Sequence, residues 1–322
     1  MPIRFAILTA GNIAGQMAET VSHMPEICRW AVAARDLDRA QAFAEKYGFA
    51  HARGSYQEVY DDPEVDLVYI GSPHSHHYQQ AKDAILAGKH VLCEKPLAPN
   101  AALAKELFRL AKEKGVLLAE ATWTRYMPFV PALRQVLEEG AIGKPLSMIC
   151  DFGFPVSGRA RLARPELAGG ALLDLGIYPL TMAALVFGEA VNTTGLCTKT
   201  EEGVDAQDCI CQTFAGGETA LLHANMLCAL DNHAVIYGEK GQIRLPLFWH
   251  CEEFTVLPRE GESRTYSFPH RISGYEYEVE SAVRAIQAGQ LECPEMPAAE
   301  TIRMLDMMDA LRASWGIRYP FE

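Results

Sequence analysis

A surplus of positive charge is the first feature that this 322-residue sequence lacks. Its 29 Lys and Arg residues face 41 Asp and Glu residues, which gives a formal net charge of -12 at pH 7. A negatively charged protein is repelled by phosphate backbones and by anionic lipid surfaces. We therefore expect no nucleic-acid partner and no binding to a membrane surface.

Signals for export, membrane insertion and metal binding are also missing. No apolar run approaches the roughly 20 residues of a membrane-spanning helix, and the N-terminus does not combine a charged region, an apolar region and a cleavage site. The 9 cysteines are scattered and form no C-x-x-C pair, which argues against a disulfide framework and a structural zinc site. The sequence predicts a cytoplasmic protein with reduced thiols and no metal.

Two domains are expected from the length, at roughly 100–200 residues each. In residues 1–121, short apolar runs alternate with amphipathic helical patterns, the runs lying at 3–8, 30–34, 65–70, 90–93 and 116–119. Parallel strands that are buried on both faces read as continuous apolar runs. Strand–helix alternation with right-handed crossovers builds such a sheet. Residues 1–121 are therefore predicted to form an α/β domain with a doubly wound parallel sheet.

The pattern changes after residue 121. Helical periods are predicted at 130–139, 171–186, 276–288 and 298–314, and β-rich stretches at 146–154, 190–197, 208–214, 219–227, 234–237 and 242–245. Glycine-containing turns separate the later strands, as hairpins require. Residues 122–322 are predicted to be an α+β domain with a large, open, mostly antiparallel sheet. Residues 219–227 are apolar at positions of both parities, so we expect a homodimer partner to cover the face that helices leave open.

The turn after the first strand resembles a phosphate-binding turn. A dinucleotide fold uses G-x-G-x-x-G/A there, so that backbone N–H groups and a helix N-terminus approach the pyrophosphate. The chain keeps the second glycine and a small third residue but departs at the first position. The predicted cofactor contacts in this turn are Thr9, Gly11, Asn12, Ile13 and Ala14.

The end of the second strand reports on the cofactor's ribose. An acidic residue there binds the 2′-hydroxyl of NAD, whereas an arginine suits the 2′-phosphate of NADP. Ala34 occupies that position, and Arg35 and Arg39 follow. A solvated helix face is the alternative explanation for both arginines. We expect NADP as the cofactor, with NAD as a second possibility.

Two further strand ends carry chemistry. Ser72, Pro73 and His77 follow the third strand, and Glu94 and Lys95 end the fourth. Ligands of open α/β sheets bind at this edge. Three histidines within residues 74–77 suggest zinc, but His74 and His76 have neither i, i+4 spacing nor an obvious third ligand. A lysine held between a strand and a proline is a candidate for proton transfer, although such a tripeptide is often only an exposed turn.

A second catalytic candidate lies on the helix predicted at 171–186. Asp174 and Tyr178 are four residues apart and therefore share one face of a mostly apolar helix. Polar side chains in such a place either bond to one another or line a cleft and face a substrate. We favour the second interpretation.

Taken together, these motifs resemble the glucose–fructose oxidoreductase/inositol dehydrogenase/rhizopine-catabolism family. The phosphate turn, Ser72-Pro73 with His77, Glu94-Lys95-Pro96 and the glycine-initiated helix of Asp174 and Tyr178 occur in the family's order. The resemblance covers nearly the whole chain. Many members have histidine where this chain has Tyr178. The tyrosine and the run Trp123-Thr124-Arg125 are most similar to the branch of dimeric trans-dihydrodiol dehydrogenases and NADP-dependent D-xylose dehydrogenases.

The resemblance implies a Rossmann domain and an NADP-linked interconversion of an alcohol and a carbonyl on a sugar or cyclic diol. Lys95 and Tyr178 would act at the reacting oxygen and Asp174 would orient them. It also implies cofactor contacts from Ser72, Pro73, His77, Glu94 and Lys95, and a homodimer built on the second-domain sheet. The implied substrate-binding residues are Trp123, Arg125, Phe152, Asp174, Tyr178 and Trp249.

Two alternatives remain at this level. A nucleotide-binding sensor of the same fold would have lost Lys95 or the helix tyrosine, and this chain has both. A reductase of a non-sugar carbonyl or an imine would differ only in the pocket. Pocket shape depends on loops such as residues 155–168, whose Arg159, Arg161 and Arg164 are explained more simply by a solvated loop than by an anionic substrate.

Overall fold

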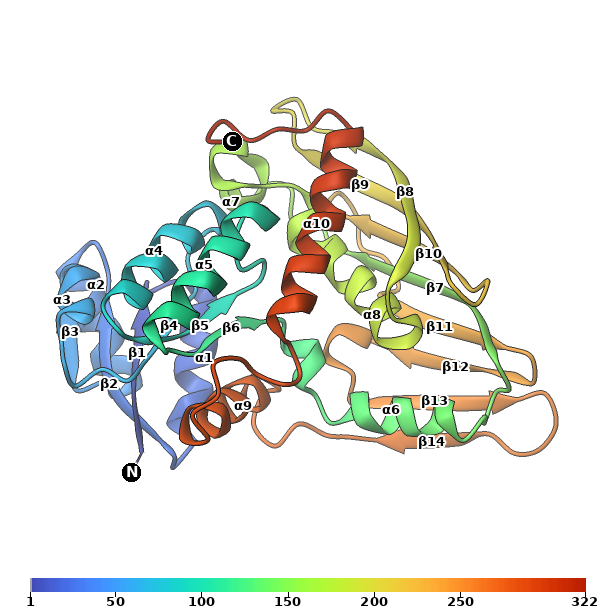
Figure 1. Ribbon diagram of the computed structural model, residues 1–322, viewed down its shortest axis with the longest axis horizontal. Coiled ribbons are helices and arrows are strands. Elements are labelled where there is room, and N and C mark those ends of the chain that lie inside the picture. Colours follow the sequence, from blue (N-terminus) through green and yellow to red (C-terminus); the bar gives the residue numbers. More distant parts are fainter. Residues whose placement is uncertain (1) are drawn as a thin grey trace. The chain divides into compact units, whose positions relative to one another are not determined.

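The computed structural model describes residues 2–322 and divides into two compact units (Figure 1). The first unit comprises Met1–Trp123 and Arg271–Arg303, and the second comprises Thr124–His270 and Met304–Glu322. The sequence-based boundary after residue 121 lies close to the first crossing. The structure differs for residues 271–303, which were expected in the second domain. Helical periodicity shows that a segment packs on a core, but not which core it chooses.

The first unit contains a parallel sheet in the order β3-β2-β1-β4-β5-β6. This confirms the predicted Rossmann-type architecture and adds the short strand β3, whose three half-buried residues give no apolar run. The strands are β1 (Ile3–Leu8), β2 (Ile27–Ala33), β3 (His51–Arg53), β4 (Leu67–Ile70), β5 (His90–Glu94) and β6 (Leu118–Ala121). All residues of β4 and β6 are buried, as expected of strands covered on both faces.

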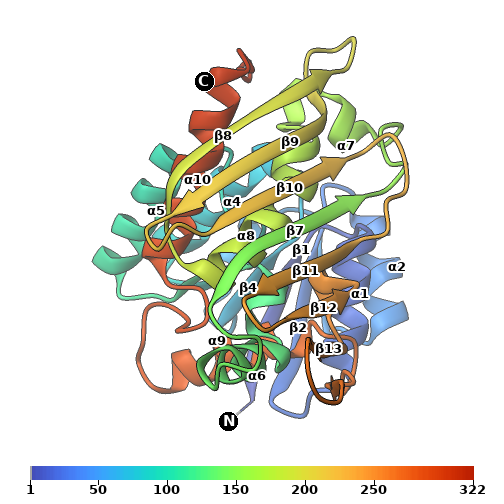
Figure 2. The ribbon, with the colours of Figure 1, turned by 90° about the vertical axis from the view of Figure 1, so that its right-hand side faces the viewer.

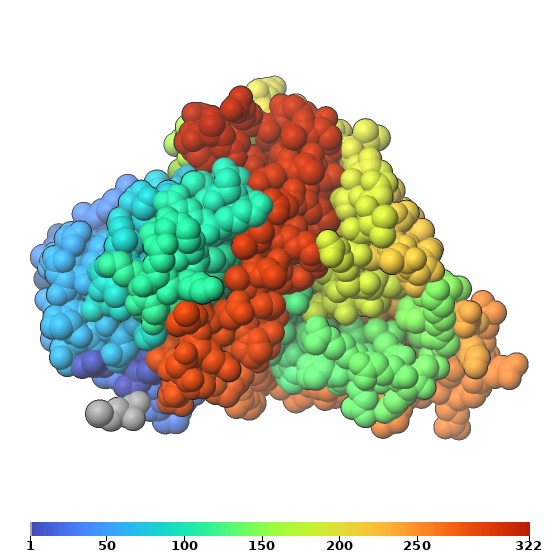
Figure 3. Space-filling model, viewed as in Figure 1, coloured from blue at the N-terminus to red at the C-terminus, as the bar shows by residue number. Residues whose placement is uncertain are grey.

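Helices cover this sheet and begin and end where the sequence supplies caps. Asp36 accepts hydrogen bonds from two backbone N–H groups at the start of α2, and Gly48 ends that helix in the left-handed region. Asn100 caps the start of α5 with one such bond, from the Leu103 N–H, and Gly115 ends that helix in the left-handed region. In Figure 3, α4 and α5 lie on the side of the first unit that faces the viewer. The helices are α1 (Asn12–Ser22), α2 (Leu37–Tyr47), α3 (Gln57–Tyr60), α4 (His74–Leu86), α5 (Ala101–Lys114) and α9 (Glu276–Gln287).

The second unit is built on an eight-stranded sheet in the order β14-β13-β12-β11-β7-β10-β9-β8. Within it, β7 and β10 pair in parallel and the other neighbours are antiparallel, which confirms the predicted mostly antiparallel sheet. Figure 2 shows one face of the sheet toward the viewer and α8 behind it. The strands are β7 (Pro145–Gly153), β8 (Ala190–Lys199), β9 (Asp205–Phe214), β10 (Thr219–Asn225), β11 (His233–Gly238), β12 (Gly241–Pro246), β13 (Glu253–Pro258) and β14 (Arg264–Ser267).

Short helical turns and three longer helices complete the chain. The helix α10 (Ala298–Ser314) contains the crossing from Arg303 to Met304 between the units. The others are η1 (Trp123–Tyr126), α6 (Phe129–Glu138), α7 (Ala160–Ala163), η2 (Pro165–Leu167), η3 (Leu172–Gly176), α8 (Ile177–Phe187) and η4 (Phe248–His250). The segment η3 is a π-helix that continues directly into α8.

One segment corrects an expectation about apolar runs. Residues Pro165–Phe187 are long and apolar enough to span a membrane by length and composition. No such run was expected from the sequence, because the polar residues of this segment interrupt it. Of its most apolar window, 83% is buried within the protein. The segment is therefore a core helix of the second unit, and its apolar character reflects packing against the sheet.

Candidate active site

The phosphate turn joins β1 to α1 and leaves room for a ligand. Gly11 is the N-cap of α1, and no side chain caps this helix. A Cβ atom placed on Gly11 would meet nothing within 4 Å, so the backbone can approach a pyrophosphate closely. Thr9 occupies the first position of the motif with φ 84°, and its hydroxyl donates to the carbonyl oxygen of Gly71 at 3.2 Å. The turn thus keeps its shape without the first glycine.

A groove of about 760 Å³ opens beside this turn. It runs between α1 and α2 and contains none of the residues at the β5 exit. It therefore lies beside the phosphate turn and apart from Lys95. Its lining comprises Ala10, Gly11, Asn12, Gly15, Gln16, Glu19, Arg39, Ala42, Phe43, Lys46 and Tyr47.

The two arginines predicted to select NADP lie around the end of β2. Arg39 donates from Nη2 to the carbonyl oxygen of Ala10 at 3.3 Å, which places its guanidinium at the phosphate turn. Burial raises the pKa of Tyr56, while the charges of Arg35 and Arg39 oppose that rise. Burial and the charge of Arg35 lower the pKa of His76. Tyr56 and His76 therefore border the same positive site, and motif spacing could not identify them.

The exits of β4 and β5 are tied together by His77. Its Nδ1 lies 2.8 Å from the carbonyl oxygen of Pro96 and its Nε2 2.8 Å from that of Ser72. Burial and the neighbouring charge of His74 lower the pKa of His77 to about 3, so the ring is neutral. The predicted cofactor contact is thus a fully buried bridge between the two strand exits. It shapes the edge next to Lys95.

Lys95 lies at the exit of β5 and is 8% exposed. The preceding Glu94 accepts a hydrogen bond from the Tyr69 hydroxyl at 2.7 Å. On the other side, the backbone N–H of Leu97 donates to Glu120 of β6 at 2.8 Å. The strand exit is therefore fixed before and after the lysine. Sequence reasoning missed Glu120, although a carboxylate within an otherwise apolar buried strand was a usable signal.

Trp123 is supported within the first unit by a residue far away in the sequence. Its ring stacks on Tyr275 with centroids 4.3 Å apart and an interplanar angle of 12°. The Tyr275 hydroxyl donates to the Gln16 side chain at 3.2 Å. The loop before α9 therefore connects α1 with Trp123, which explains why residues 271–303 belong to this unit. Arg125 lies on η1 two residues after Trp123 and is buried.

Asp174 lies in the π-helix η3 and pairs with Arg161. Arg161 Nη1 donates to Oδ1 at 2.7 Å, and Nη2 donates to Oδ2 at 3.1 Å. This two-point geometry orients the carboxylate and tethers the loop of residues 155–168. A solvated loop was the expected setting of this arginine, which the structure corrects. The loop folds back onto η3 because a buried carboxylate offers a better partner than water.

Tyr178 stands in an aromatic wall of the second unit. Its ring centroid lies 5.0 Å from that of Phe152, and Phe152 lies 4.7 Å from Trp249. Phe154 and Phe248 also pack on Phe152. The Thr124 hydroxyl donates to the carbonyl oxygen of Trp249 at 2.6 Å. The predicted residues Phe152, Tyr178 and Trp249 are therefore neighbours, and Phe154 and Phe248 add to the wall that sequence reasoning outlined.

Taken separately, the two units hold different groups that a redox enzyme can use. The first unit holds a phosphate turn, a pair of arginines and a lysine at the ligand-binding edge of a parallel sheet. The second holds a phenol and a carboxylate beside apolar rings. Such a set suits a dinucleotide and a small hydroxylated molecule, because rings pack on carbon skeletons while the few polar groups orient the hydroxyls.

Comparisons with known proteins give the same picture. Residues 3–122 match the model of an oxidoreductase family with an NAD-binding Rossmann fold, GFO_IDH_MocA, and residues 130–244 match a GFO/IDH/MocA C-terminal domain. Trans-1,2-dihydrobenzene-1,2-diol dehydrogenase from Danio rerio is 33% identical over 331 residues, covering 99% of this chain and 98% of the relative. The enzyme of the same name from Mus musculus is 34% identical over 340 residues and covers 99% of both chains.

Solved structures agree with these relatives. A 3-ketoreductase from Actinomadura kijaniata, in complex with NADP and TDP-benzene, superposes with a TM-score of 0.88 at 27% identity, covering 97% of this chain and 98% of that one. The same ketoreductase was solved with a lysine replaced by alanine and with a tyrosine replaced by phenylalanine. The chain thus belongs to the glucose–fructose oxidoreductase/inositol dehydrogenase/rhizopine-catabolism (Gfo/Idh/MocA) family and is an NAD(P)-dependent oxidoreductase.

Proposed function

We propose that this oxidoreductase interconverts an alcohol and a carbonyl on a small polyhydroxylated molecule, a sugar or a cyclic diol. One observation carries the proposal: Lys95 is buried at the ligand-binding edge of the first unit, and Tyr178 is buried in an aromatic wall of the second. Buried titratable groups at the ligand-binding edge of a sheet and beside an apolar wall are candidates for a functional site. The dihydrodiol dehydrogenases similar to this chain act on molecules of that kind by name.

We assign to Tyr178 the transfer of the proton to or from the reacting oxygen. A free tyrosine has a pKa of ~10, too high for an efficient base near neutral pH. An ammonium group near the phenol favours the phenolate, and this is the role we assign to Lys95. The nicotinamide, when bound, supplies or accepts the hydride. The apparent pKa values of two coupled groups belong to the pair and not to either residue. The alternative form of the proposal therefore gives the proton transfer to Lys95 and the supporting role to Tyr178.

Asp174 and the aromatic wall position the substrate. The bidentate pair with Arg161 fixes the Asp174 carboxylate, which is then available to orient a hydroxyl beside Tyr178. The rings of Phe152 and Trp249 offer a flat apolar surface that fits the carbon face of a sugar or a cyclic diol. We assign Trp123 and Arg125 to the same pocket.

A substrate screen with matched variants tests the reaction. Aldoses, inositols, cyclic diols and dicarbonyls are assayed spectrophotometrically with NADP(H) and NAD(H). On the substrate found, Lys95→Met and Tyr178→Phe should each lower kcat by ~10²-fold or more, the scale of lost acid–base catalysis. Cofactor affinity should change much less.

Two surface variants serve as controls. Lys112→Met on α5 and Tyr237→Phe on β11 remove the same groups at exposed positions and should keep full turnover. Near-normal kcat in both Lys95→Met and Tyr178→Phe would place the chemistry elsewhere. Cofactor binding without turnover of any compound in the screen would favour a nucleotide-binding sensor. Turnover of dicarbonyls or imines alone would favour the non-sugar reductase.

NADP is the proposed cofactor, with NAD as the weaker one. Ala34 replaces the acidic residue that would bind a ribose 2′-hydroxyl, and Arg35 and Arg39 border the end of β2 together with Tyr56 and His76. Guanidinium groups bind phosphate through charge-assisted hydrogen bonds. We therefore assign Arg35 and Arg39 to the 2′-phosphate, and Gly11 with Ala14 to the pyrophosphate.

We also propose that the chain forms a homodimer through the outer face of the eight-stranded sheet. In register across neighbouring strands, Leu221 of β10 lies between Cys211 of β9 and Ile149 of β7. Leu221 is 51% exposed and Leu196 of β8 is 79% exposed. Contiguous exposed apolar residues of this kind mark an interaction surface, and a C₂ partner is the commonest cover.

The proposed location is the cytoplasm. All nine cysteines are free thiols, and pairs are absent although several lie at the surface of the second unit. Thiols persist in a reducing compartment.

A further inference from the structure

A cluster of two histidines and a glutamate lies in the second unit next to the aromatic wall. His250 ends the turn η4, directly after Trp249, and Glu252 stands two residues later at the start of β13. His270 follows β14, the strand paired with β13. The hairpin therefore returns the chain to its own starting point and brings together residues that are 20 apart in the sequence. Sequence reasoning did not find the cluster, because the approach of His270 to the other two residues depends on how the hairpin returns.

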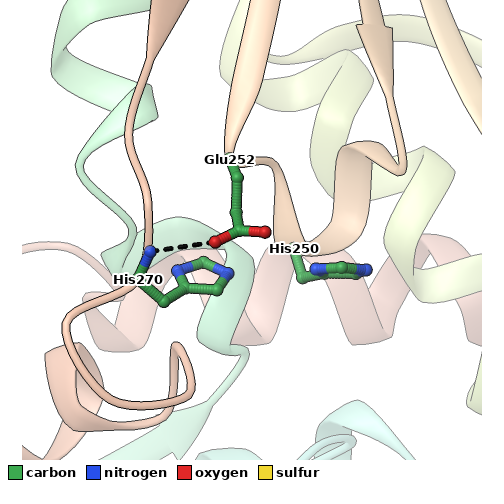
Figure 4. Close-up of side chains that lie close together, drawn as sticks. All are labelled: His250, Glu252 and His270. Carbon is green, nitrogen blue, oxygen red and sulfur yellow. Dashed lines mark hydrogen bonds between the residues drawn. The ribbon is translucent and has the colours of Figure 1, made fainter.

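The three side chains converge on one point. One ligand atom from each residue lies within 4.8 Å of the ligand atoms of the other two. Figure 4 shows the Glu252 carboxylate above and between the two imidazoles in that view. The imidazole rings have centroids 6.0 Å apart and are inclined by 41°. Ligand atoms around a tetrahedral zinc ion are about 3.3 Å apart, given bonds of about 2.0–2.1 Å. Small rotations of the side chains close the difference.

The backbone holds this arrangement in advance. The N–H of His270 donates to Oε1 of Glu252 at 3.0 Å, and the N–H of Phe268 donates to the Glu252 carbonyl oxygen at 2.6 Å. These bonds continue the β13–β14 ladder to the cluster. The His250 backbone N–H is bonded to the carbonyl oxygen of Leu247. Few conformational degrees of freedom remain to be fixed when an ion binds.

The donor set is selective for a class of ion. Two imidazole nitrogens with one carboxylate suit first-row transition metals and zinc, whereas calcium and magnesium prefer all-oxygen sites. The neighbouring Cys251 is not part of the set, because its thiol donates to the carbonyl oxygen of Glu253 at 3.0 Å. The site therefore offers two nitrogen donors and one oxygen donor, and it leaves a fourth position for water.

We propose that His250, Glu252 and His270 form a binding site for a divalent transition-metal ion of the zinc class. The ion crosslinks the turn η4 to the end of β14. Because His250 directly follows Trp249, the crosslink stiffens the part of the aromatic wall that Trp249 provides. The site shares no residue with the proposed catalytic pair, and the ion takes no part in the hydride transfer.

Calorimetry on the chelator-treated full chain tests the site with Zn²⁺ as the probe. The expected result is one tight site per chain. His250→Gln, Glu252→Gln and His270→Gln should each weaken it by about 100-fold or more, because loss of a direct ligand exceeds the 10- to 100-fold typical of outer-shell changes. Glu252→Gln keeps an oxygen that can accept the His270 N–H, so it tests the ligand without breaking the hairpin. His23→Ala, on the surface of the first unit, is the control and should bind as the parent chain does.

A second measurement separates the proposed site from surface thiols, because Cys209, Cys211 and Cys228 are exposed and thiolates are zinc ligands. Co²⁺ in place of Zn²⁺ should give d–d bands without a thiolate charge-transfer band, and these bands should disappear in His270→Gln. A thermal-unfolding midpoint that Zn²⁺ raises in the parent chain but not in His270→Gln would add support. Thiolate bands, unchanged affinity in all three variants, or no stoichiometric binding would each overturn the proposal.

Discussion

We propose that Ala34, directly after β2, and the two arginines that follow it determine how the chain binds the ribose of its cofactor. A carboxylate here would bind the 2′-hydroxyl of NAD and repel a 2′-phosphate. The methyl group of Ala34 does neither, so the choice passes to the guanidinium groups of Arg35 and Arg39. Arg39 is held at the phosphate turn by its bond to Ala10, and it is therefore the better-placed phosphate ligand.

Replacing Arg39 with alanine should weaken NADPH binding about tenfold or more. One charge-assisted hydrogen bond contributes ~1.5–3 kcal/mol, and ~1.4 kcal/mol corresponds to a tenfold change in affinity. Binding of NADH, which has no 2′-phosphate, should change by less than about threefold. Titration calorimetry with both cofactors measures the two effects in one variant. Equal losses for NADPH and NADH, or tighter binding of NADH by the parent chain, would contradict the assignment.

Individual residues were predicted from the sequence where a motif fixes both chemistry and place. Gly11 is recognisable because a strand, a small turn and a helix follow one another locally. Arg161 was not recognised as a partner of Asp174, because the pair depends on the path of a loop. His77 was recognised as important, but only the fold shows that both of its ring nitrogens face carbonyl oxygens.

Among the elements, the loop before α9 is organised around Glu276. Burial raises the pKa of Glu276, but the backbone N–H groups of Arg271, Ile272, Ser273 and Gly274 donate to its carboxylate and lower the pKa overall. The same loop presents Tyr275 to Trp123. The sequence predicted the helix but not this loop, because the bonds of a carboxylate to its own preceding turn leave no periodic signal.

Glu276→Gln should destabilise the protein by roughly 1–3 kcal/mol, since the buried N–H groups lose a charged acceptor. A carboxyl whose pKa is lower when folded stabilises the protein above its unfolded pKa and loses that effect as the pH falls. The difference in thermal midpoint between parent and variant should therefore be large at pH 7 and shrink toward pH 3. The KM for substrate should rise, because the loop would no longer hold Tyr275 against Trp123. The affinity for NADPH should not change. A difference that stays constant with pH would refute this role for the charge.

Beneath η3 lies a second pair of carboxyl groups. Oδ2 of Asp205 accepts the backbone N–H of Leu172 at 2.5 Å, and Asp205 and Asp208 are both fully buried. Burial and the neighbouring charge of Asp205 raise the pKa of Asp208 well above its ordinary value. Burial also raises the pKa of Asp205, and Asp205 is the acceptor at the start of the helix that carries Asp174. The sequence predicted a strand at 208–214, but neither the burial of Asp208 nor its partner Asp205.

The variant Asp208→Asn should remove a pH dependence of stability. An acid whose pKa is raised on folding holds its proton in the native state after the unfolded chain has lost it, so stability falls as the pH rises above ~4. Each pKa unit by which folding weakens the acid corresponds to about 1.4 kcal/mol of folding free energy. The amide keeps the shape of the side chain but does not titrate. Thermal midpoints at pH 5 and pH 8 should differ less in Asp208→Asn than in the parent chain. An equal or larger difference in the variant would show that Asp208 is ionised in the folded protein.

The fold of each unit was largely predictable from the sequence, because helical and strand patterns and their order along the chain specify it. Continuous apolar runs with intervening helices indicated the parallel sheet, and alternation with glycine turns indicated the antiparallel one. The assignment of residues 271–303 was not predictable. It depends on contacts such as the bond from the Leu118 N–H to the Leu291 carbonyl oxygen and that from Thr301 to Glu120, and hydrophobic pattern alone does not specify them.

The proposed homodimer is a property of the whole molecule and can be tested by one substitution on the exposed sheet face. Leu221→Glu places a charge in the middle of the exposed apolar row of the second-unit sheet, and burying it against a partner would be costly. Light scattering at micromolar concentration should report twice 35.5 kDa for the parent chain and 35.5 kDa for the variant. Leu86→Glu on α4 changes a residue of similar exposure, 45%, outside the sheet and should leave the dimer intact. A parent chain that is already a monomer would refute the proposed interface.

The division of the chain into two units has a consequence for how the protein can be taken apart. The polypeptide passes between the units three times, after Trp123, after His270 and after Arg303 within α10. If a protease cuts the chain at one of these connections, the two fragments stay associated, because both contribute residues to the same folded unit. Expression of residues 1–123 alone would leave Glu120 without Thr301 and Trp123 without Tyr275. Neither unit can therefore be obtained by a single truncation, and a nucleotide-binding fragment has to be made by joining two distant stretches of the gene.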